Sequence, residues 1–157
     1  MERVRWVFLA YRLPREPSTP RIMVWRKLRR LGVVQVVDGL VALPLDARTR
    51  EQLEWIADEV LDAGGESSLW IAEAASARVE RELAAQLAAA VAAEYAAVIS
   101  AAEAVAGESM VHRRRTLAKL RREMHRIKAR DFFPPAEADR ATAAVERLAA
   151  AVEVVSG

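Results

Sequence analysis

The sequence predicts an α+β fold, and three observations support that prediction. The first half of the chain alternates short runs rich in β-branched and aromatic residues with amphipathic helical stretches. From Ala75 onward only helical patterns follow, and one of them is rich in alanine. The chain has 157 residues, 53% hydrophobic and 29% charged, so it can bury a core. We therefore expect a sheet-containing subdomain in residues 1–75 and a helical annex in residues 76–157.

The N-terminal region predicts one strand followed by one helix. Residues 6–13 (WVFLAYRL) are aromatic and aliphatic, as in a strand, and a proline follows them. Thr19 is the expected N-cap of the helix, with Pro20 at its first position. The helix should end at Leu31, because Gly32 follows as a stop signal.

The next residues predict a hairpin, a second helix and a fourth strand. VVQVV and LVALP are joined by Asp38-Gly39, a dipeptide suited to a type I′ turn. Thr49, with a glutamine three residues later, resembles a capping box, and Gly64-Gly65 should end that helix. Residues 67–73 (SSLWIAE) complete the order β-α-β-β-α-β, which is the ferredoxin-like sandwich. Right-handed crossovers would place both helices on one face of a four-stranded sheet.

The annex should contain about three helices, the first two forming an antiparallel hairpin. Residues 76–106 carry valines on a seven-residue rhythm, and Gly107 breaks this pattern before Ser109 caps the next helix. Both helices have apolar stripes, which are Leu87, Val91, Val98 and Val105 in the first and Met110, Leu117, Leu120, Met124 and Ile127 in the second. Matched stripes of this kind are typical of paired helices. Residues 137–155 predict the last helix.

The charge distribution is more informative than the net charge of +2. Residues 1–45 hold nine basic and three acidic side chains, and residues 109–130 hold nine and one. The segment between them, residues 46–108, holds four and thirteen, and residues 131–157 hold two and five. Two basic blocks are thus separated by an acidic one. The 21 Arg against 3 Lys suit bidentate recognition of oxyanions, but they also fit a GC-rich coding sequence.

The second basic block is an arginine-rich helix with an unusual N-terminal end. Arg113, Arg114 and Arg115 lie in its first turns, where the helix dipole disfavours positive charge, so they suggest an anionic partner. Basic residues near its C-terminal end are favoured and need no partner. Three alternatives remain open, namely solvated or internally paired charge, contact with DNA phosphate, and a small-oxyanion site. The candidate binding residues here are Arg113, Arg114, Arg115, Lys119, Arg122 and Arg126.

The first basic block surrounds the predicted helix at residues 19–31. Its candidate binding residues are Arg15, Arg21, Arg26, Lys27, Arg29 and Arg30. A tryptophan among them, Trp25, could stack on an arginine or contact nucleic acid, but a tryptophan in an amphipathic helix also serves as a core residue. Arg15, Arg21 and the loop amides near the helix N-terminus would suit an anion if the groove there is open.

Motifs for enzymes, metals and membrane spans are absent from the sequence. There is no cysteine, no glycine-rich phosphate loop and no nucleophile elbow, and His112 and His125 lack the spacing of zinc ligands. Residues 84–107 contain no Lys or Arg, but they are mostly alanine with Glu94 near the centre, which disfavours a membrane span. We expect a cytoplasmic non-enzyme without metal or resident cofactor.

Three longer segments resemble a known family. They are YRLPREPSTPRIMVWRKLRRLG, DGLVALPLDARTREQLEWIADEVLDAGGES and HRIKARDFFP. They are similar to the N-terminal domain of the chromate-resistance regulator family (ChrB), and the likeness extends from about Trp6 to Pro134. The resemblance implies a transcriptional regulator of a chromate efflux operon that binds DNA and is released by chromate. Members usually continue into a second domain, whereas this chain stops at Gly157, so we expect a stand-alone N-terminal domain.

The leading hypothesis is therefore a chromate-responsive DNA-binding domain that forms a homodimer. Its partners would be promoter DNA, which the two basic helices contact, and chromate, which an arginine pocket senses. An alternative is an interaction module whose helical annex builds an oligomer without DNA binding of its own. A third possibility is an enzyme that acts on chromate.

Overall fold

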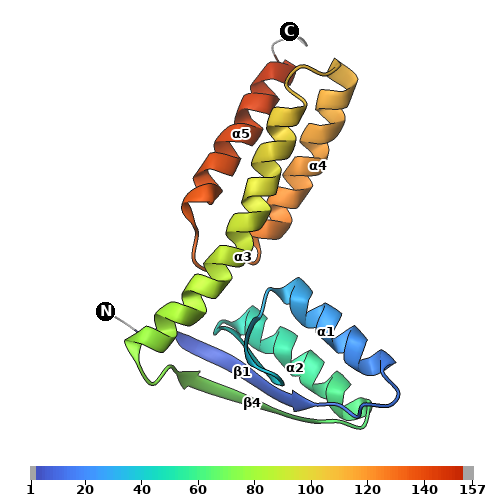
Figure 1. The fold of residues 1–157 in the computed structure, drawn as a ribbon, viewed down its shortest axis with the longest axis vertical. Coiled ribbons are helices and arrows are strands. Elements are labelled where there is room, and N and C mark those ends of the chain that lie inside the picture. The colour runs from blue at the N-terminus through green and yellow to red at the C-terminus, as the bar shows by residue number, and fades with distance from the viewer. Residues whose placement is uncertain (1–2, 154–157) are drawn as a thin grey trace. The chain divides into compact units, whose positions relative to one another are not determined.

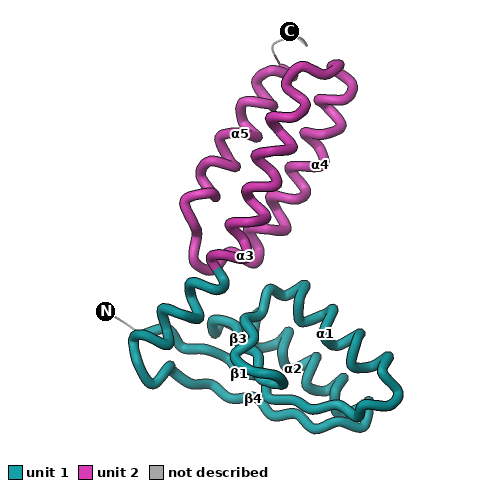
Figure 2. The backbone as a smooth tube through the Cα atoms, in the orientation of Figure 1, with its two compact units in different colours: residues 1–87 teal, residues 88–157 magenta. Residues whose placement is uncertain are grey.

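The computed structural model describes residues 3–153, which form four strands and five helices. The chain divides into two compact units, residues 1–87 and residues 88–157 (Figure 2). The division falls within the long helix α3 (Ala77–Ala104). The domain boundary expected after residue 75 stays a prediction.

Unit 1 is a mixed α/β structure with one four-stranded sheet. Its elements follow the predicted chain order and are β1 (Arg5–Arg12), α1 (Thr19–Leu31), β2 (Val34–Val37), β3 (Leu40–Pro44), α2 (Ala47–Asp62) and β4 (Glu66–Glu73). The strands lie in the order β2-β3-β1-β4, and all three neighbouring pairs are antiparallel. Helices α1 and α2 lie side by side over one face of the sheet (Figure 1).

The core of unit 1 fills the space between this sheet and its two helices. Leu9 and Val41 are cross-strand partners, and both are fully buried. The helices contribute fully buried residues of their own, such as Leu28 from α1 and Leu53 from α2. These apolar contacts hold α1 in a fixed orientation, so its remaining faces are presented to solvent.

Both helix starts in unit 1 differ from the prediction. Helix α1 has Ser18 rather than Thr19 as its N-cap, and no side chain caps it. Helix α2 begins with Asp46 as N-cap, so Thr49 is the third helical residue rather than the cap. The backbone N–H of Thr49 donates to Asp46 at 2.7 Å, and the Asp46 N–H donates to Thr49 Oγ1 at 2.9 Å. The carboxylate thus accepts an otherwise unpaired N–H of the first turn, which makes Asp46 the better cap.

The hairpin between β2 and β3 forms as predicted, but its turn is of another type. A type I′ turn needs positive φ at both central residues. Gly39 has φ of 79°, whereas Asp38 does not have positive φ, so the type I′ prediction was wrong. Gly39 is required for a second reason, since a Cβ there would lie 2.7 Å from the Tyr11 carbonyl oxygen. The Tyr11 N–H donates to the Gly39 oxygen at 2.8 Å, which fixes the end of β1 against the turn.

Unit 2 is a bundle of three helices, formed by α3 from Ala88 onward, α4 (Met110–Lys128) and α5 (Ala136–Glu153) (Figure 1). Its core confirms the apolar stripes of α3 and α4, because Val91, Val98, Val105, Leu117, Leu120, Met124 and Ile127 are all buried. Ser109 caps α4 as predicted, and its hydroxyl accepts from the His112 N–H at 3.2 Å. The last two residues of the helix expected at 137–155 lie outside the described part of the chain.

A polar network ties the loop after α4 to α3. Tyr95 is fully buried, and its hydroxyl donates to Asp131 Oδ2 at 2.7 Å. Burial and this hydrogen bond raise the pKa of Tyr95, so its hydroxyl remains a donor in neutral solution. Next to it, Arg130 forms an ion pair with Glu94 at 3.0 Å. The aspartate of the DFF segment thus has a structural partner within the bundle.

Helix α3 is long and apolar enough to cross a membrane by length and composition alone. Helices in the cores of proteins that do not cross a membrane can have the same length and apolar composition. From Val91 onward, α3 contributes one face to the buried cluster of unit 2, and its hydropathy comes largely from alanine. This helix is therefore weak support for a membrane span.

Candidate functional site

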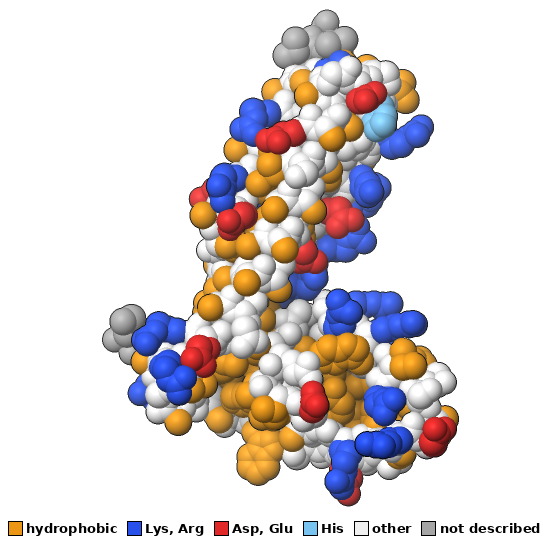
Figure 3. Space-filling model, viewed as in Figure 1, with side chains coloured by type: hydrophobic (Ala, Val, Ile, Leu, Met, Phe, Trp, Pro, Cys, Tyr) orange, Lys and Arg blue, Asp and Glu red, His pale blue; other side chains and the backbone are white. Residues whose placement is uncertain are grey.

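Helix α1 carries an exposed row of arginines. Because Val24 and Leu28 face the core, the charged side chains lie on the remaining faces of the helix. Arg21, Arg26, Arg29 and Arg30 are all exposed, and within the described part of the chain none of them has an ion pair. Figure 3 shows Lys and Arg side chains gathered over this helix. With no acidic residue in α1, this surface keeps its full positive charge.

The other two candidates of the first block differ from this row. Lys27 forms an ion pair with Glu59 of α2, with its Nζ 2.7 Å and 2.9 Å from the two carboxylate oxygens. This pair joins α1 to α2 and neutralises Lys27. Arg15 lies in the loop before α1 and is exposed. The structure thus brings five of the six predicted cations to α1 and leaves Arg15 in the preceding loop.

A groove opens beside the N-terminal half of α1, with a volume of about 380 Å³. Its walls come from the end of β1, from α1 and from the β2–β3 hairpin, and they include Tyr11, Arg21, Trp25, Gln35 and Asp38. The sequence-based hypothesis placed an anion at Arg15, Arg21 and the loop amides if a groove is open there. The groove is lined by Arg21 but not by Arg15 or the residues of that loop, so the anion site stays a prediction. Trp25 is half-buried and lines it, so part of its ring is accessible from the groove.

Two polar residues of this groove were not anticipated as site residues. Tyr11 was assigned to a strand and Asp38 to a turn, and only the packing of β1 against the hairpin brings them together. Burial, and secondarily the charge of Asp38, raise the pKa of Tyr11, so its hydroxyl stays protonated. Gln35 Nε2 donates to Asp38 Oδ1 at 3.1 Å. Of the residues that line this groove, only Arg21 and Trp25 were recognised from the sequence as candidates for binding.

Helix α4 combines paired and outward-facing cations. Arg126 forms an ion pair with Glu123 at 2.9 Å, so internal pairing accounts for one predicted site residue. Arg115, Lys119 and Arg122 are exposed, without an ion pair to the described residues. Arg114 is also exposed and has an interaction within the chain. Figure 3 shows a row of blue side chains along this helix.

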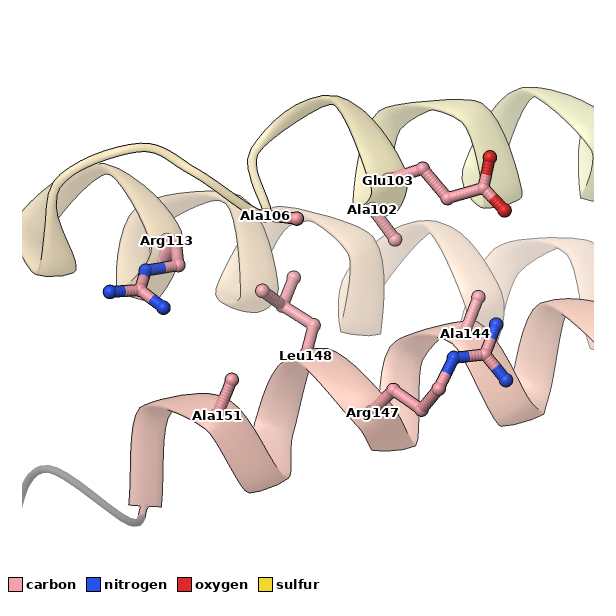
Figure 4. A pocket seen from close by; sticks show the side chains of 8 residues that line it. All are labelled: Ala102, Glu103, Ala106, Arg113, Ala144, Arg147, Leu148 and Ala151. Atoms are coloured by element: carbon pink, nitrogen blue, oxygen red, sulfur yellow. The ribbon is translucent and has the colours of Figure 1, made fainter.

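Arg113 has a different environment from its two neighbours. It is half-buried, and its Nε is buried without a hydrogen-bond partner among the described residues. It lines a slot of about 240 Å³ within unit 2, whose floor is made by alanines and Leu148 (Figure 4). Arg113 lies at one end of this slot, and Arg147 and Glu103 lie at the other. Arg147 of α5 was not predicted as a site residue, because it lies outside both basic blocks of the sequence.

The residues described contain no cluster of three or more His, Asp or Glu side chains arranged to hold a metal ion. The surfaces described above present arginines, aromatic rings and a few hydrogen-bonding groups.

A comparison with family models assigns residues 21–114 to the model described as "Protein ChrB, N-terminal". The match covers more than half of the chain. This chain belongs to the ChrB N-terminal family. The family resemblance expected from the sequence is thereby confirmed. No curated protein and no solved structure gave a significant match.

The two basic helices differ in how much of each lies within the matched range. It contains the whole arginine row of α1, together with Trp25, Gln35 and Asp38 of the groove. It ends at Arg114, so the exposed cations of α4 from Arg115 onward lie outside it. The match therefore covers unit 1 from Arg21 onward, α3 and the start of α4, and it leaves out β1 and Tyr11 of the groove.

Proposed function

We propose that this chain is the DNA-binding part of a chromate-responsive transcriptional regulator. The observation that carries the proposal is the row of exposed, unpaired arginines on α1, in a chain that belongs to a family of chromate-resistance regulators. Arginine forks bind phosphate oxygens in a bidentate manner, and such contacts supply most of the affinity for DNA that is independent of sequence.

The geometry of α1 suits contact with a nucleic-acid backbone. A helix of 13 residues is about 20 Å long, which is enough to span several phosphates of one strand. Its buried residues and the Lys27–Glu59 pair hold it against the sheet and α2, so binding orders little additional backbone. The exposed cations of α4, chiefly Arg115, Lys119 and Arg122, are proposed as secondary contacts.

The finer features of this regulator belong to the same proposal. Chromate would act as the effector, and the half-buried Arg113 is the arginine whose surroundings best suit a small oxyanion. We also infer a cytoplasmic homodimer without catalytic activity. The order of elements in unit 1 and its antiparallel sheet support its description as a ferredoxin-like sandwich.

The direct test is binding of the purified chain to the DNA upstream of its own coding sequence, measured by fluorescence anisotropy between 50 and 300 mM salt. Each phosphate contact should contribute about −0.9 to the slope of log K against log salt concentration. We expect a slope of about −3.6 for four arginine contacts, and a steeper slope if the cations of α4 also contact phosphate. Failure to bind this DNA even at the lowest salt concentration would overturn the proposal.

Effector sensing calls for a separate measurement. Calorimetric titration with chromate, repeated with sulfate and in the presence of the DNA, measures the coupling between the two ligands. An effector that releases DNA must bind the free protein more tightly than the complex. Equal affinity for chromate in both states, or equal affinity for sulfate and chromate, would remove the sensing function from this chain.

One observation favours the alternative of an interaction module. Strand β4 is an edge of the sheet, and it exposes 61% of Trp70 and 38% of Ile71. Exposed apolar residues on an unpaired edge favour association with another chain. If Trp70→Ser dissociated an oligomer in sizing experiments while wild-type protein showed no DNA binding, this second function would replace the first.

A further inference from the structure

The groove beside α1 has the composition of a small-molecule site rather than of a plain phosphate contact. Its volume of about 380 Å³ lies within the range of about 300–1,000 Å³ that such sites occupy. It combines apolar walls with a few polar groups that converge on the same space, which is the usual arrangement in a ligand pocket. A flat phosphate-binding surface would need neither the aromatic ring nor the carboxylate.

The apolar part of the groove suits a flat, aromatic group. Trp25 and Ile22 come from successive turns of α1 on the groove side, and Leu13 lines the groove from the segment after β1. The indole ring of Trp25 is half-buried, so it is held in place while part of it remains accessible. Stacking of a base on such a ring is favourable for every nucleobase and depends little on its identity.

The polar part supplies what stacking lacks, which is discrimination between bases. Asp38 is exposed. Its Oδ1 accepts one hydrogen bond from Gln35 and keeps a second lone pair, so both Oδ1 and Oδ2 can accept from a ligand. A carboxylate accepts two parallel N–H donors well, and guanine presents such a pair at N1 and N2. Adenine has no N–H at the corresponding ring nitrogen. The protonated Tyr11 hydroxyl, close to Asp38, is a further donor at the groove.

Arg21 completes the set at the α1 side of the groove. It is exposed and has no ion pair within the described part of the chain, whereas the neighbouring Arg12 is paired with Glu66 at 2.8 Å. A guanidinium in this position suits the phosphate of a nucleotide whose base lies on Trp25.

We propose that this groove binds a guanine nucleotide, with the base stacked on Trp25, its N1–H and N2–H edge on Asp38, and its phosphate on Arg21. The same chemistry is offered by a free nucleotide and by an unpaired guanine within a nucleic-acid strand. The proposal does not require that α1 binds promoter DNA, because the groove shares only Arg21 with the arginine row of α1, and Arg26, Arg29 and Arg30 lie outside it.

The test is calorimetric titration of the full chain with GMP, AMP, CMP and guanosine. We expect GMP to bind about tenfold more tightly than AMP, which is within the range of discrimination that a bidentate base contact supplies. We expect Asp38→Asn to abolish this preference, and Arg21→Gln to bring the affinity for GMP close to that for guanosine. No detectable binding of GMP at millimolar concentration, or an unchanged preference in Asp38→Asn, would overturn the proposal.

Two controls separate this groove from the DNA surface. Arg26→Gln removes an α1 charge outside the groove, so it should weaken promoter binding and leave GMP binding unchanged. Trp25→Phe keeps an aromatic ring and should retain GMP binding, whereas Trp25→Ala should lose it. Thermal unfolding of each variant identifies loss of fold, and Trp25→Phe keeps the proposal testable if Trp25→Ala fails to fold. If Arg26→Gln weakened GMP binding as strongly as Arg21→Gln, general charge attraction would replace the groove as the explanation.

The source of the nucleotide is settled by a further titration. A five-nucleotide strand with one central guanine is compared with the same strand carrying adenine, and both are compared with GMP. Tighter binding of the guanine strand than of GMP assigns the groove to nucleic acid, and the reverse order assigns it to the free nucleotide. Equal binding of the guanine and adenine strands together with equal binding of GMP and AMP contradicts guanine recognition.

Discussion

Helices α1 and α4 are both strongly basic, yet they use their charges differently. In α1 one cation of five, Lys27, has an ion-pair partner, and the four arginines face solvent. In α4 and the residues that follow it, Arg126 and Arg130 are paired with acids and Arg113 is half-buried beside an apolar slot, while Arg115, Lys119 and Arg122 are exposed without an ion pair to the described residues. A run of basic residues is therefore not a sufficient indication of a binding surface. Which charges remain unpaired in the fold is the more useful criterion.

The two helices also differ in how they are held. Helix α4 buries four residues along a stripe in the core of unit 2, whereas α1 buries two against the sheet. A large share of α4 is thus committed to stabilising the bundle. Helix α1 is the more peripheral element, and its exposed faces are free for contact with a ligand.

The largest expected effect comes from removing charge from each helix in turn. The α1 variant changes Arg21, Arg26, Arg29 and Arg30 to Gln. The matched α4 variant changes Arg115, Lys119 and Arg122 to Gln, together with Arg121, which is also exposed on α4. If all four α1 arginines contact phosphate, the salt slope of DNA binding falls by about 3.6 and the affinity at 0.15 M salt falls about a thousandfold. We expect less than half of this change in slope for the α4 variant.

Glutamine keeps the helix propensity of arginine, so both variants should remain folded, which circular dichroism checks. Anisotropy measurements at several salt concentrations give the slope for each variant. A larger loss in the α4 variant than in the α1 variant would reverse the ranking of the two helices. Equal losses would show that the DNA responds only to net charge.

The elements of the fold could be predicted from the sequence because their signals are local. Alternation in strands, glycines after helices and the seven-residue rhythm of valines each act over a few neighbouring residues. The helix starts were less certain, since Ser18 and Thr19 are adjacent and Asp46 lies three residues before Thr49. Only the hydrogen bonds of the folded first turn decide between such neighbours.

The candidate site could be predicted only in part, for a related reason. Its cations form clusters along the chain and are visible in the sequence. The groove is assembled by β1, α1 and the hairpin, so Tyr11 and Asp38 meet only in the folded sheet. The pairing of Arg130 with Glu94 depends in the same way on the packing of α3 in the bundle.

A second prediction separates the stability of the unit 2 bundle from DNA binding, because the substitution weakens the bundle and removes no charge. Tyr95→Phe removes the hydroxyl that donates to Asp131 and leaves that buried carboxylate without this donor. We expect the free energy of unfolding to fall by about 1–3 kcal/mol. Urea denaturation measures the change, and DNA binding of the folded variant should equal that of wild type.

The same tyrosine gives a pH dependence with a definite sign. The pKa of Tyr95 is raised above 10.0 in the fold, so above pH 10 the unfolded chain releases a proton that the folded chain retains. Wild-type stability should therefore decline above pH 10, by up to about 1.4 kcal/mol per pH unit from this group, and Tyr95→Phe should lack this contribution. A stability difference between the two proteins that stays constant from pH 8 to pH 11 would contradict the role given to this hydrogen bond.

A third prediction concerns the paired charge next to α4. Arg130→Gln leaves Glu94 without its partner at a partly buried position. We expect a loss of about 0.5–1 kcal/mol in the free energy of unfolding, because the pair is only partly screened by solvent. Arg115→Gln is the matched control, as it removes one exposed charge and should change stability little. A loss of DNA affinity in Arg130→Gln larger than in Arg115→Gln would place this paired arginine on the binding surface.

The smallest expected effect belongs to Lys27, the one paired cation of α1. Its ion pair with Glu59 is well exposed, with 45% and 32% of the two side chains accessible, so the coupling energy should be about 0.5 kcal/mol or less. A double-mutant cycle of Lys27→Met and Glu59→Gln, measured by urea denaturation, gives this value.

The same variants test whether only the unpaired charges of α1 contact DNA. Because Glu59 neutralises Lys27, Lys27→Met should reduce the salt slope of DNA binding by less than Arg26→Gln does. Glu59→Gln should increase that slope, since it frees Lys27 on the arginine side of α1. An unchanged slope in Glu59→Gln would show that the DNA does not reach this part of α1.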